Sequence, residues 1–546
     1  MYLRSIAIEN YRAIREARIT LDRTTLLIGE NDSGRTSVIE ALMLVLGAPA
    51  DRFETRLKPA HFHRTPGGTP GGLRVQLRFQ EQSPGDWRAP EEIARVLTGG
   101  HGDRRALEFE FSASLDVATG RIAPSWRAPR ATGPGGHLEN SSGLLQLIRE
   151  LVPVLWLRSG LLVDASDAPP APRLKPDPLL EALELHHRNL VTGEAPDLEA
   201  ELDLGARAAS AVIEKHTSLF EGAAPMMGAM ASDILKRRLV ASTTAARHGG
   251  PAAGKIGMLL LLGAILQLTR RSVLPEGRPL LVLDNPESNL HPMTLASVWN
   301  LLERITWQKL ITTNSGTLLG NAPLGSIRRL TRQEGTVREW FAPPGLLSRE
   351  DLRRVAYHVR SRRASAMFAR CWLLVEGETE FWMLPELARV LGYDFASEGI
   401  VPVEFAQCGL PPLIKLANCL GIAWQVLTDG DEAGDRYTAT AQNAARRTHQ
   451  EHAGARVAQI RERDIESCFW RHGYDDVVRR IAGATAPRTA ARATIRKAIE
   501  RTSKPFLALS LIEAVAERGP AGVPPIMRQV IESCVDLART AVRARR

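Results

Sequence analysis

The amino-acid sequence predicts an α/β protein with two successive domains, each containing strands that end in polar, glycine-containing turns. In the first domain, an apolar strand ending at Ile28 runs into GENDSGRTS, Gly29 to Ser37, and a helix follows. In the second, strands and helices alternate again from about residue 368. At 546 residues the chain is too long for one hydrophobic core, and 44% hydrophobic with 24% charged residues is typical of a globular protein.

Several protein classes are excluded by composition. No apolar run reaches the roughly 18 residues that a membrane span needs, and MYLRSIAIENYRAI lacks the layout of a signal peptide. The five cysteines contain no C-x-x-C pair, which argues against a disulfide framework and a zinc ribbon. We therefore expect a cytoplasmic protein without a membrane partner. The net charge of +9 permits nucleic-acid contact but does not demonstrate it, because arginine-rich chains are often basic for compositional reasons.

Local patterns predict the elements of the first domain. LRSIAIENYRAI and ARITLDRTTLLIG alternate as half-buried strands do, and TSVIEALMLVLG has helical spacing closed by Gly47. GLRVQLRFQ and LEFEFSASLDV predict a pair of strands. A proline-rich connector at 166–178 leads into a polar helical region, which we interpret as an insertion and a candidate dimerisation region.

A basic helical connector then precedes the strand WLLVEG, and βαβ alternation resumes through VPVEFAQCG and WQVLTDGD. The tail after Asp475 is helical and basic. We expect the first domain in two parts, residues 1–165 and 246–345, separated by a helical insertion at residues 166–245. A linker at residues 346–367 then leads to the second domain, residues 368–475, and to its helical C-terminal part, residues 476–546.

The first motif predicts a phosphate site. GENDSGRTS fits the pattern G-x-x-x-x-G-K-[ST] except that Arg35 replaces the lysine. Such a loop turns backbone N–H groups and the helix opened at Thr36 toward phosphate oxygens, and the Thr36 hydroxyl would bind Mg²⁺. Taken alone, the motif also fits an ordinary glycine-rich turn. The nucleotide-binding residues that we assign here are Gly29, Asn31, Gly34, Arg35, Thr36 and Ser37.

Two later strands complete this pattern. LLVLDNP ends an apolar run at Asp284, as a strand that delivers a magnesium-associated carboxylate does, and KLITTNSG supplies a strand followed by Asn314. This order resembles ATPase heads of the ABC type, and the SMC and RecF-like branch shares the N-terminal pattern. The resemblance implies that ATP with Mg²⁺ binds near Asp284, Asn285 and Asn314, and that two protomers sandwich the nucleotide.

Hydrolysis by this head is a separate question. Heads of this type carry D-E-P-E and T-T-H-S, whereas this chain has D-N-P-E from Asp284 and T-T-N-S from Thr312. The amide of Asn285 cannot act as a general base near neutral pH, and the planar fork of Arg35 is no geometric substitute for an ammonium. HGGPAAGKIG lies where an LSGG-type signature is expected and does not match it. We expect ATP to be bound and hydrolysed slowly or not at all, with Glu287 as an alternative base.

Carboxylates gather in the second domain. WLLVEGETE places Glu376 at the end of a strand and Glu380 four residues on, on the same face if a helix begins there. WQVLTDGDEAGD ends another strand with Asp429 and Asp431, which a glycine between them can turn to the same side. Carboxylates at strand ends repel one another unless a divalent cation neutralises them, and oxygen ligands favour Mg²⁺ or Mn²⁺. The alternative is a set of ordinary acidic loops.

The E-G-x-T-E turn followed by D-G-D resembles the Toprim fold of topoisomerases, primases and OLD-family nucleases. RDIESCFW adds Asp464 and Glu466. In OLD-like proteins an acidic residue of this element completes the metal site. A helix N-cap aspartate followed by a solvated glutamate explains the same pattern equally well. RTSKPFLAL resembles the family's lysine-bearing helix, so Lys504 would stabilise the pentavalent phosphate. From the residues alone Lys504 is a surface lysine.

The whole chain is similar to the overcoming-lysogenisation-defect (OLD) family of nucleases and to the Gabija nuclease subunit. The predicted fold is an ABC/SMC-type P-loop ATPase domain with a helical insertion, followed by a Toprim domain (Rossmann-like βαβ) with a helical tail. The resemblance implies a DNA endonuclease regulated by ATP, in a homodimer, with a helicase-like or other defence partner, acting in antiphage defence or DNA repair. The implied catalytic residues are Glu376, Asp429, Asp431 and Lys504, and the implied ligands of two Mg²⁺ or Mn²⁺ ions are Glu376, Glu380, Asp429, Asp431, Asp464 and Glu466.

Two other functions remain open at this point. Toprim sites also support topoisomerase-like cleavage, but none of the six tyrosines has a recognisable catalytic setting. A nucleotide-sensing DNA-binding scaffold is consistent with the altered head, although the intact acidic set argues against it.

Overall fold

The computed structural model describes residues 2–47, 57–64, 71–85, 104–129, 137–139, 142–152, 154–158, 280–287, 307–361, 363–447, 456–483 and 490–543, with short pieces at 93, 96–99, 292, 295, 299 and 302–303. They fall into two compact units, Met1–Leu318 with Gly335–Glu339, and Leu319–Glu334 with Trp340–Arg546. The expected insertion 166–245 and the HGGPAAGKIG segment lie outside the described residues. Within the described ranges, no helix has the length and apolar character that crossing a membrane requires.

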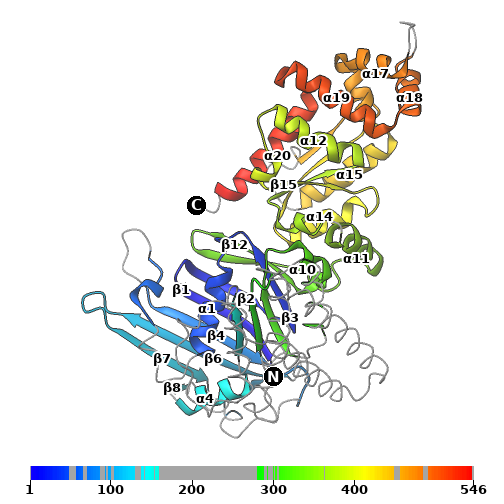
Figure 1. The fold of residues 1–546 in the computed structure, drawn as a ribbon. Coiled ribbons are helices and arrows are strands. Elements are labelled where there is room, and N and C mark those ends of the chain that lie inside the picture. The colour runs from blue at the N-terminus through cyan, green and yellow to red at the C-terminus, as the bar shows by residue number, and fades with distance from the viewer. Residues whose placement is uncertain are drawn as a thin grey trace, which may run out of the picture. The chain divides into compact units, whose positions relative to one another are not determined.

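The first unit begins with antiparallel strands in the order β8-β7-β6-β4-β1-β2 (Figure 1), and β13 pairs with β2 in parallel. Its strands alternate buried and exposed side chains, so one face covers the core. The predicted pairing of GLRVQLRFQ with LEFEFSASLDV is confirmed, since β4 pairs with β6 and Leu77 lies opposite Phe109. The strands are β1 (Tyr2–Tyr11), β2 (Ile14–Thr20), β4 (Leu73–Gln80), β5 (Thr98–Gly99), β6 (Arg105–Leu115), β7 (Ile122–Pro129), β8 (His137–Glu139) and β13 (Thr336–Trp340).

A parallel group of strands continues this unit in the order β3-β11-β10-β9. All five residues of β10 (Leu280–Asp284) and of β11 (Gln308–Thr312) are buried, as expected for parallel strands covered on both faces. The other two strands are β3 (Thr24–Gly29) and β9 (Val154–Arg158), and the helices of this part are α1 (Arg35–Leu46) and α4 (Ser142–Leu151). Because the strands are parallel, the turns after β3, β10 and β11 meet at one edge.

The second unit contains a four-stranded parallel sheet in the order β15-β14-β16-β17 (Figure 1). Alternate residues of β14 (Cys371–Val375) enter a core shared with α12 and α20, while α14 and α15 pack on β16 (Ala423–Thr428). The predicted βαβ alternation is therefore confirmed. The remaining elements of this layer are α12 (Glu378–Val390), α13 (Phe395–Glu398), β15 (Ile400–Glu404), α14 (Leu410–Cys419), α15 (Glu432–Arg447) and β17 (Val457–Gln459).

The helical tail shares its core with this sheet. Cys534 of α20 and Leu511 of α19 belong to the same buried cluster as Cys371 and Leu373 of β14. The connector before β14 also packs on this unit, since Arg363 pairs with Glu404 at 3.0 Å. The elements outside the four-stranded sheet layer are α10 (Gly316–Asn321), η4 (Leu324–Ser326), β12 (Ile327–Gln333), α11 (Arg349–Val355), η5 (Ala356–Ser361), η6 (Ala364–Phe368), α16 (Ile465–Phe469), η8 (Trp470–Tyr474), α17 (Asp475–Ala482), α18 (Ala491–Arg501), α19 (Lys504–Arg518), η9 (Pro520–Gly522) and α20 (Pro525–Arg543).

Candidate functional site

The glycine-rich loop between β3 and α1 presents backbone donors to solvent. α1 begins at Arg35, one residue before the predicted start, and its N-cap Gly34 has φ 94° and no capping side chain. A side chain at Gly34 would be strained, and its Cβ would lie 3.1 Å from Val337 Cγ2. The first-turn N–H groups therefore remain available to an anion. Asn31 and Thr36 are exposed and Ser37 is half-buried at this loop.

Arg35 does not extend toward the open side of the loop. Its side chain is buried, and its Nη1 donates a hydrogen bond of 2.9 Å to the carbonyl oxygen of Thr313. Burial lowers the pKa of Arg35, and the negative charges of Glu287 and Asp284 oppose that shift. The sequence predicts a cation beside the phosphates, and the structure places this guanidinium on the turn after β11, at the same edge as the loop.

The turn after β10 is held by hydrogen bonds to β11. Asp284 Oδ1 accepts a 2.6 Å hydrogen bond from the Thr312 hydroxyl, and the backbone N–H of Asn285 donates to the Thr312 carbonyl at 3.1 Å. Asn285 adopts φ 49°, a left-handed conformation that asparagine tolerates. Thr312 was not assigned a role from the sequence, although the T-T-N-S segment contains it.

Among the residues that the structure describes, three buried polar atoms near this edge have no hydrogen-bond partner: Ser33 Oγ, Asn285 Oδ1 and Glu287 Oε2. The other carboxylate oxygen of Glu287 accepts a hydrogen bond from the Asn314 backbone N–H. A buried polar atom without a partner is costly unless a ligand or water satisfies it. The loop, Asp284, Asn285 and Asn314 thus meet at one edge whose polar groups fit a phosphorylated ligand.

The second site lies at the carboxyl ends of β14 and β16. Glu376 directly follows β14, and α12 begins at Glu378, after Glu376. The sequence argument required Glu376 and Glu380 to share one helix face, and they do not, because Glu376 lies outside α12. Glu380 is nonetheless turned back toward the strand end, because its Oε2 accepts a 3.1 Å hydrogen bond from the Gly377 backbone N–H. Glu380 is only 4% exposed.

The turn after β16 depends on two glycines. A Cβ at Gly434 would lie 1.8 Å from the carbonyl oxygen of Asp429, and one at Gly430 would lie 2.3 Å from that of Glu462. The Gly434 N–H donates 2.8 Å to Asp431 Oδ1, which orients this carboxylate. Gly434 was not assigned a role from the sequence, although the spacing of D-G-D-E-A-G contains it.

The carboxylates of both turns repel one another. Burial, and after it the charges of Glu380 and Glu376, raise the pKa of Asp429 to about 8. The pKa of Glu376 is raised by burial, then by Asp431 and Glu380. These mutual effects require the four side chains to lie close together, so the structure brings the E-G-x-T-E and D-G-D motifs into one site.

The D-I-E element contributes at the same edge. Asp464 is the N-cap of α16 and accepts a 2.8 Å hydrogen bond from the Ser467 N–H, the arrangement that the capping alternative describes. Glu466 is 4% exposed and lies 3.3 Å from Lys504 Nζ. Burial raises the pKa of Glu466, and Lys504 opposes the shift. For Lys504, burial lowers the pKa but attraction to Glu466 and Glu380 outweighs it, so the net shift is upward.

The donor set fits a hard divalent cation. As they stand, no three Asp, Glu, His or Cys side chains in the described ranges are grouped so that they could hold a metal ion. Glu380 accepts a hydrogen bond from Gly377, and Glu466 is paired with Lys504. Glu376 Oε2 is nevertheless buried and has no hydrogen-bond partner among the described residues, and burial together with the neighbouring carboxylates raises the pKa of Asp429 to about 8. A cation would satisfy both groups, with oxygen ligands of the kind that Mg²⁺ prefers.

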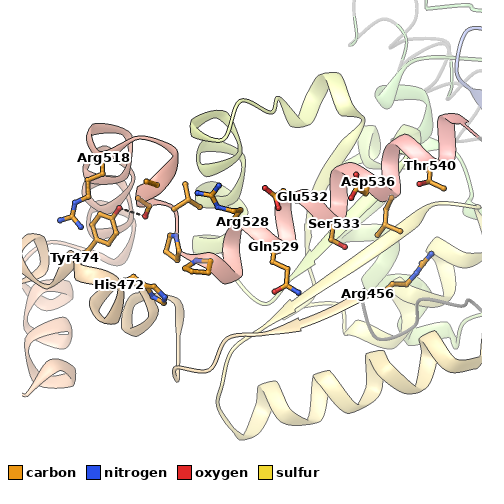
Figure 2. A pocket seen from close by; sticks show the side chains of 16 residues that line it. Arg456, His472, Tyr474, Arg518, Arg528, Gln529, Glu532, Ser533, Asp536 and Thr540 are labelled. Carbon is orange, nitrogen blue, oxygen red and sulfur yellow. Dashed lines mark hydrogen bonds between the residues drawn. The ribbon is translucent and has the colours of Figure 1, made fainter.

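A cavity of about 1310 Å³ lies elsewhere in the second unit (Figure 2). It follows one face of α20, and Tyr474 at its end donates a 2.7 Å hydrogen bond to the Gly522 carbonyl. Its charged lining is mixed, with Arg456 and Arg528 beside Glu532 and Asp536. None of the acidic residues at the ends of β14 and β16 lines it, so this cavity is separate from the carboxylate site.

A P-loop head and a Toprim domain in one chain define the OLD type of ATPase–Toprim protein, a nuclease-type, nucleotide-binding class. Residues 367–431 match the model of the overcoming lysogenization defect protein-like TOPRIM domain. The chain belongs to the family described as protein of unknown function (DUF2813), whose model matches residues 1–366. It is 33% identical over 580 residues to the uncharacterized protein YbjD of Escherichia coli (strain K12), covering 99% of each chain.

Solved structures that are similar to parts of the chain include OLD proteins and SMC heads. The C-terminal region of the Burkholderia pseudomallei OLD protein has 20% identity and a TM-score of 0.26, covering 31% of this chain and 99% of that chain. The SMC head domain from Thermotoga maritima has 14% identity and a TM-score of 0.30, covering 63% of this chain and 100% of that chain. The fold class itself follows from the strand order and from the motifs at the strand ends.

Proposed function

We propose that this protein is a divalent-metal-dependent DNA endonuclease, with its chemistry in the Toprim site and ATP binding in the head as its regulator. The observation that carries the proposal is the environment of Asp429, whose pKa is raised to about 8 by burial and by the surrounding carboxylates. A site that concentrates negative charge at the ends of parallel strands suits cations and the phosphates bound to them.

The roles of the residues follow from their positions. Glu376, Asp429 and Asp431 would hold one cation, with Glu380 and Glu466 helping to hold a second after leaving Gly377 and Lys504. Bound Mg²⁺ or Mn²⁺ would activate water and neutralise the phosphodiester. Lys504, half exposed beside Glu466, would then stabilise the negative charge that develops on the phosphate.

The head supports ATP binding more than ATP turnover. Its loop leaves helix N–H groups uncapped, and Ser33, Asn285 and Glu287 each carry a buried polar atom without a hydrogen-bond partner. The position after Asp284 carries an amide, which cannot take a proton from water near neutral pH. We therefore assign to the head a regulatory role, in a homodimer whose two heads close on the nucleotide.

The decisive experiment is nicking of supercoiled plasmid in Mg²⁺ or Mn²⁺ without ATP. Asp431→Asn removes the charge but keeps an acceptor for the Gly434 N–H. Asp394→Asn is the matched control, since Asp394 is an exposed helix N-cap that accepts from Ser397. Cutting by wild type and Asp394→Asn that disappears in Asp431→Asn supports the nuclease. Equal cutting by all three contradicts it, and a covalent protein–DNA adduct would indicate a topoisomerase instead.

A further inference from the structure

One ammonium group acts on the carboxylates of the Toprim site. Lys504 begins α19, and its Nζ lies 3.3 Å from Glu466 Oε1. Burial lowers the pKa of Lys504, but the charges of Glu466, Glu380 and Asp429 raise it, and the net shift is upward. Burial and the neighbouring carboxylates raise the pKa of Glu376, and the charge of Lys504 opposes that shift. A single positive charge therefore serves acidic side chains from α12, α16 and the turns after β14 and β16.

Two of these carboxylates are deeply buried. Glu466 and Glu380 are each 4% exposed, and α12, which carries Glu380, packs against α19. Ionised carboxylates at this depth are costly unless a cation neutralises them. Glu380 and Glu466 are also the residues that would help to hold a second divalent cation. Lys504 thus supplies, from within the chain, positive charge at the place where that cation would bind.

The ion pair between Lys504 and Glu466 is loose. Its 3.3 Å is longer than the roughly 2.7–2.9 Å of charge-assisted hydrogen bonds. Among the residues that the structure describes, Glu466 Oε1 has no hydrogen-bond partner, and neither has Glu376 Oε2. The ammonium therefore neutralises these oxygens without filling their bonding capacity, which direct coordination to a divalent cation would do.

The backbone of Lys504 is held in place while its side chain reaches solvent. Ser503 caps α19 by accepting a hydrogen bond from the Phe506 N–H, and Leu507 in the same turn is fully buried. The Lys504 side chain is 49% exposed. The ammonium can therefore turn from Glu466 toward an anion on the solvent side without any movement of the helix.

A phosphodiester is the anion that the proposed nuclease brings to this position. When it attracts the ammonium, Glu466 loses its counter-charge and becomes free to bind a cation. We propose that Lys504 is an internal counter-ion, which reserves the position between Glu380 and Glu466 until a substrate phosphate draws it away, so that the second cation and the substrate bind together. The two-cation site is then complete only on a bound phosphodiester. This inference rests on the proposed nuclease function and names how the same site is regulated.

Counting bound Mn²⁺ tests this order of binding without cleavage. Free Mn²⁺ is measured by electron paramagnetic resonance with the full-length protein and no nucleotide. The variants are Lys504→Met, which removes the charge, Lys504→Arg, which keeps it, and Lys504→Met combined with Glu466→Gln. Lys497→Met is the matched control, because Lys497 is an exposed lysine on α18. The melting temperature of each variant shows that it is folded.

We expect wild type, Lys504→Arg and Lys497→Met each to bind one Mn²⁺ tightly. Lys504→Met should bind a second ion at least about tenfold more tightly than wild type does, because removing a neighbouring like charge shifts such an equilibrium by at least that factor. The added Glu466→Gln change should abolish this gain. Two equally tight ions in wild type overturn the counter-ion, and so does a second ion that Lys504→Met binds no more tightly than Lys497→Met.

A short blunt DNA duplex tests the coupling to substrate, with its binding followed by fluorescence anisotropy and the duplex without protein as the blank. Bound duplex should bring the second Mn²⁺ to wild type, and a duplex that binds without doing so overturns the coupling. Plasmid nicking keeps the two proposals apart. Nicking by wild type that is lost in Asp431→Asn retains the nuclease even where the Mn²⁺ counts contradict the counter-ion. The expected counts in a protein that cuts no plasmid support the counter-ion alone.

Discussion

Lys504 Nζ lies 3.3 Å from Glu466 Oε1, so an ion pair joins the first turn of α19 to α16 at the edge of the Toprim sheet. The two partners differ in exposure: the Glu466 side chain is 5% exposed and that of Lys504 is 49% exposed. The buried carboxylate therefore holds one side of an ammonium whose other side faces solvent. That arrangement leaves the ammonium of Lys504 open to a phosphate on its solvent side.

Replacing Lys504 tests whether its charge serves the reaction. We expect Lys504→Met to reduce the rate of plasmid nicking at saturating Mn²⁺ roughly 100-fold, because a positioned charge that stabilises a developing anion contributes about that much. Lys504→Arg should restore part of the rate. The matched control is Lys497→Met, an exposed lysine on α18. Equal nicking rates for Lys504→Met and Lys497→Met would show that Lys504 is a surface lysine without a role in the reaction.

The raised pKa of Asp429 predicts how metal binding depends on pH. Below its pKa of about 8 a proton must leave before the carboxylate binds a cation. Affinity for Mn²⁺ should therefore rise about tenfold per pH unit up to about pH 8 and then level off, as one released proton requires. Electron paramagnetic resonance titration of free Mn²⁺ measures this. Asp429→Asn should bind more weakly and lose the slope; an unchanged slope would assign the proton to another group.

The carboxyl group of Asp429 also predicts that the stability of the metal-free protein falls as pH rises. The pKa of Asp429 in the folded state lies above its ordinary value, so folding favours the protonated form. Its contribution to stability is present at acid pH and is lost as pH rises through about 8. The melting temperature of the metal-free protein should thus decline toward pH 8 more steeply in wild type than in Asp429→Asn. Differential scanning calorimetry in EDTA decides between the two slopes.

Asn285 predicts slow ATP turnover by the head. We expect Asn285→Glu to raise the rate of phosphate release at least about tenfold, since positioned general bases contribute about 100-fold or more, while Asn285→Gln should not. Asn285 has φ 49°, so either larger side chain costs about 1 kcal/mol in this conformation, and the Gln variant controls for that cost. Rapid ATP turnover by wild type would show that Glu287 or another group already supplies the base.

Gly434 predicts a steric constraint on the acidic turn. Gly434→Ala would place Cβ 1.8 Å from the Asp429 carbonyl oxygen, and the backbone must shift to relieve the overlap. We expect a loss of stability of about 1–3 kcal/mol, together with weaker Mn²⁺ binding. Gly325→Ala should be neutral, because nothing lies within 4 Å of a Cβ built there. Urea denaturation compares the two variants, and equal midpoints would mean that the turn adapts without cost.

Much of the fold could be predicted from local patterns. Alternation of apolar residues identified β1, β4 and β6, and the apolar run before Asp284 identified β10, because burial on one or both faces constrains residues near one another in the chain. The glycine-containing turns marked the strand ends where polar groups gather. Gly34 and Gly434 illustrate why: the first has a positive φ, and the second has no room for a side chain.

The sequence by itself determined the fold class, the two polar strand-end motifs and the residue types that they carry. Only the tertiary structure decided the partners: Arg35 bonds to the Thr313 carbonyl, Asp284 to Thr312, and Lys504 pairs with Glu466. The physical reason is the range of the interactions. Helical and strand periodicity arise between neighbours in the chain, whereas the partner of a buried charge is chosen by packing among residues as far as 278 positions away.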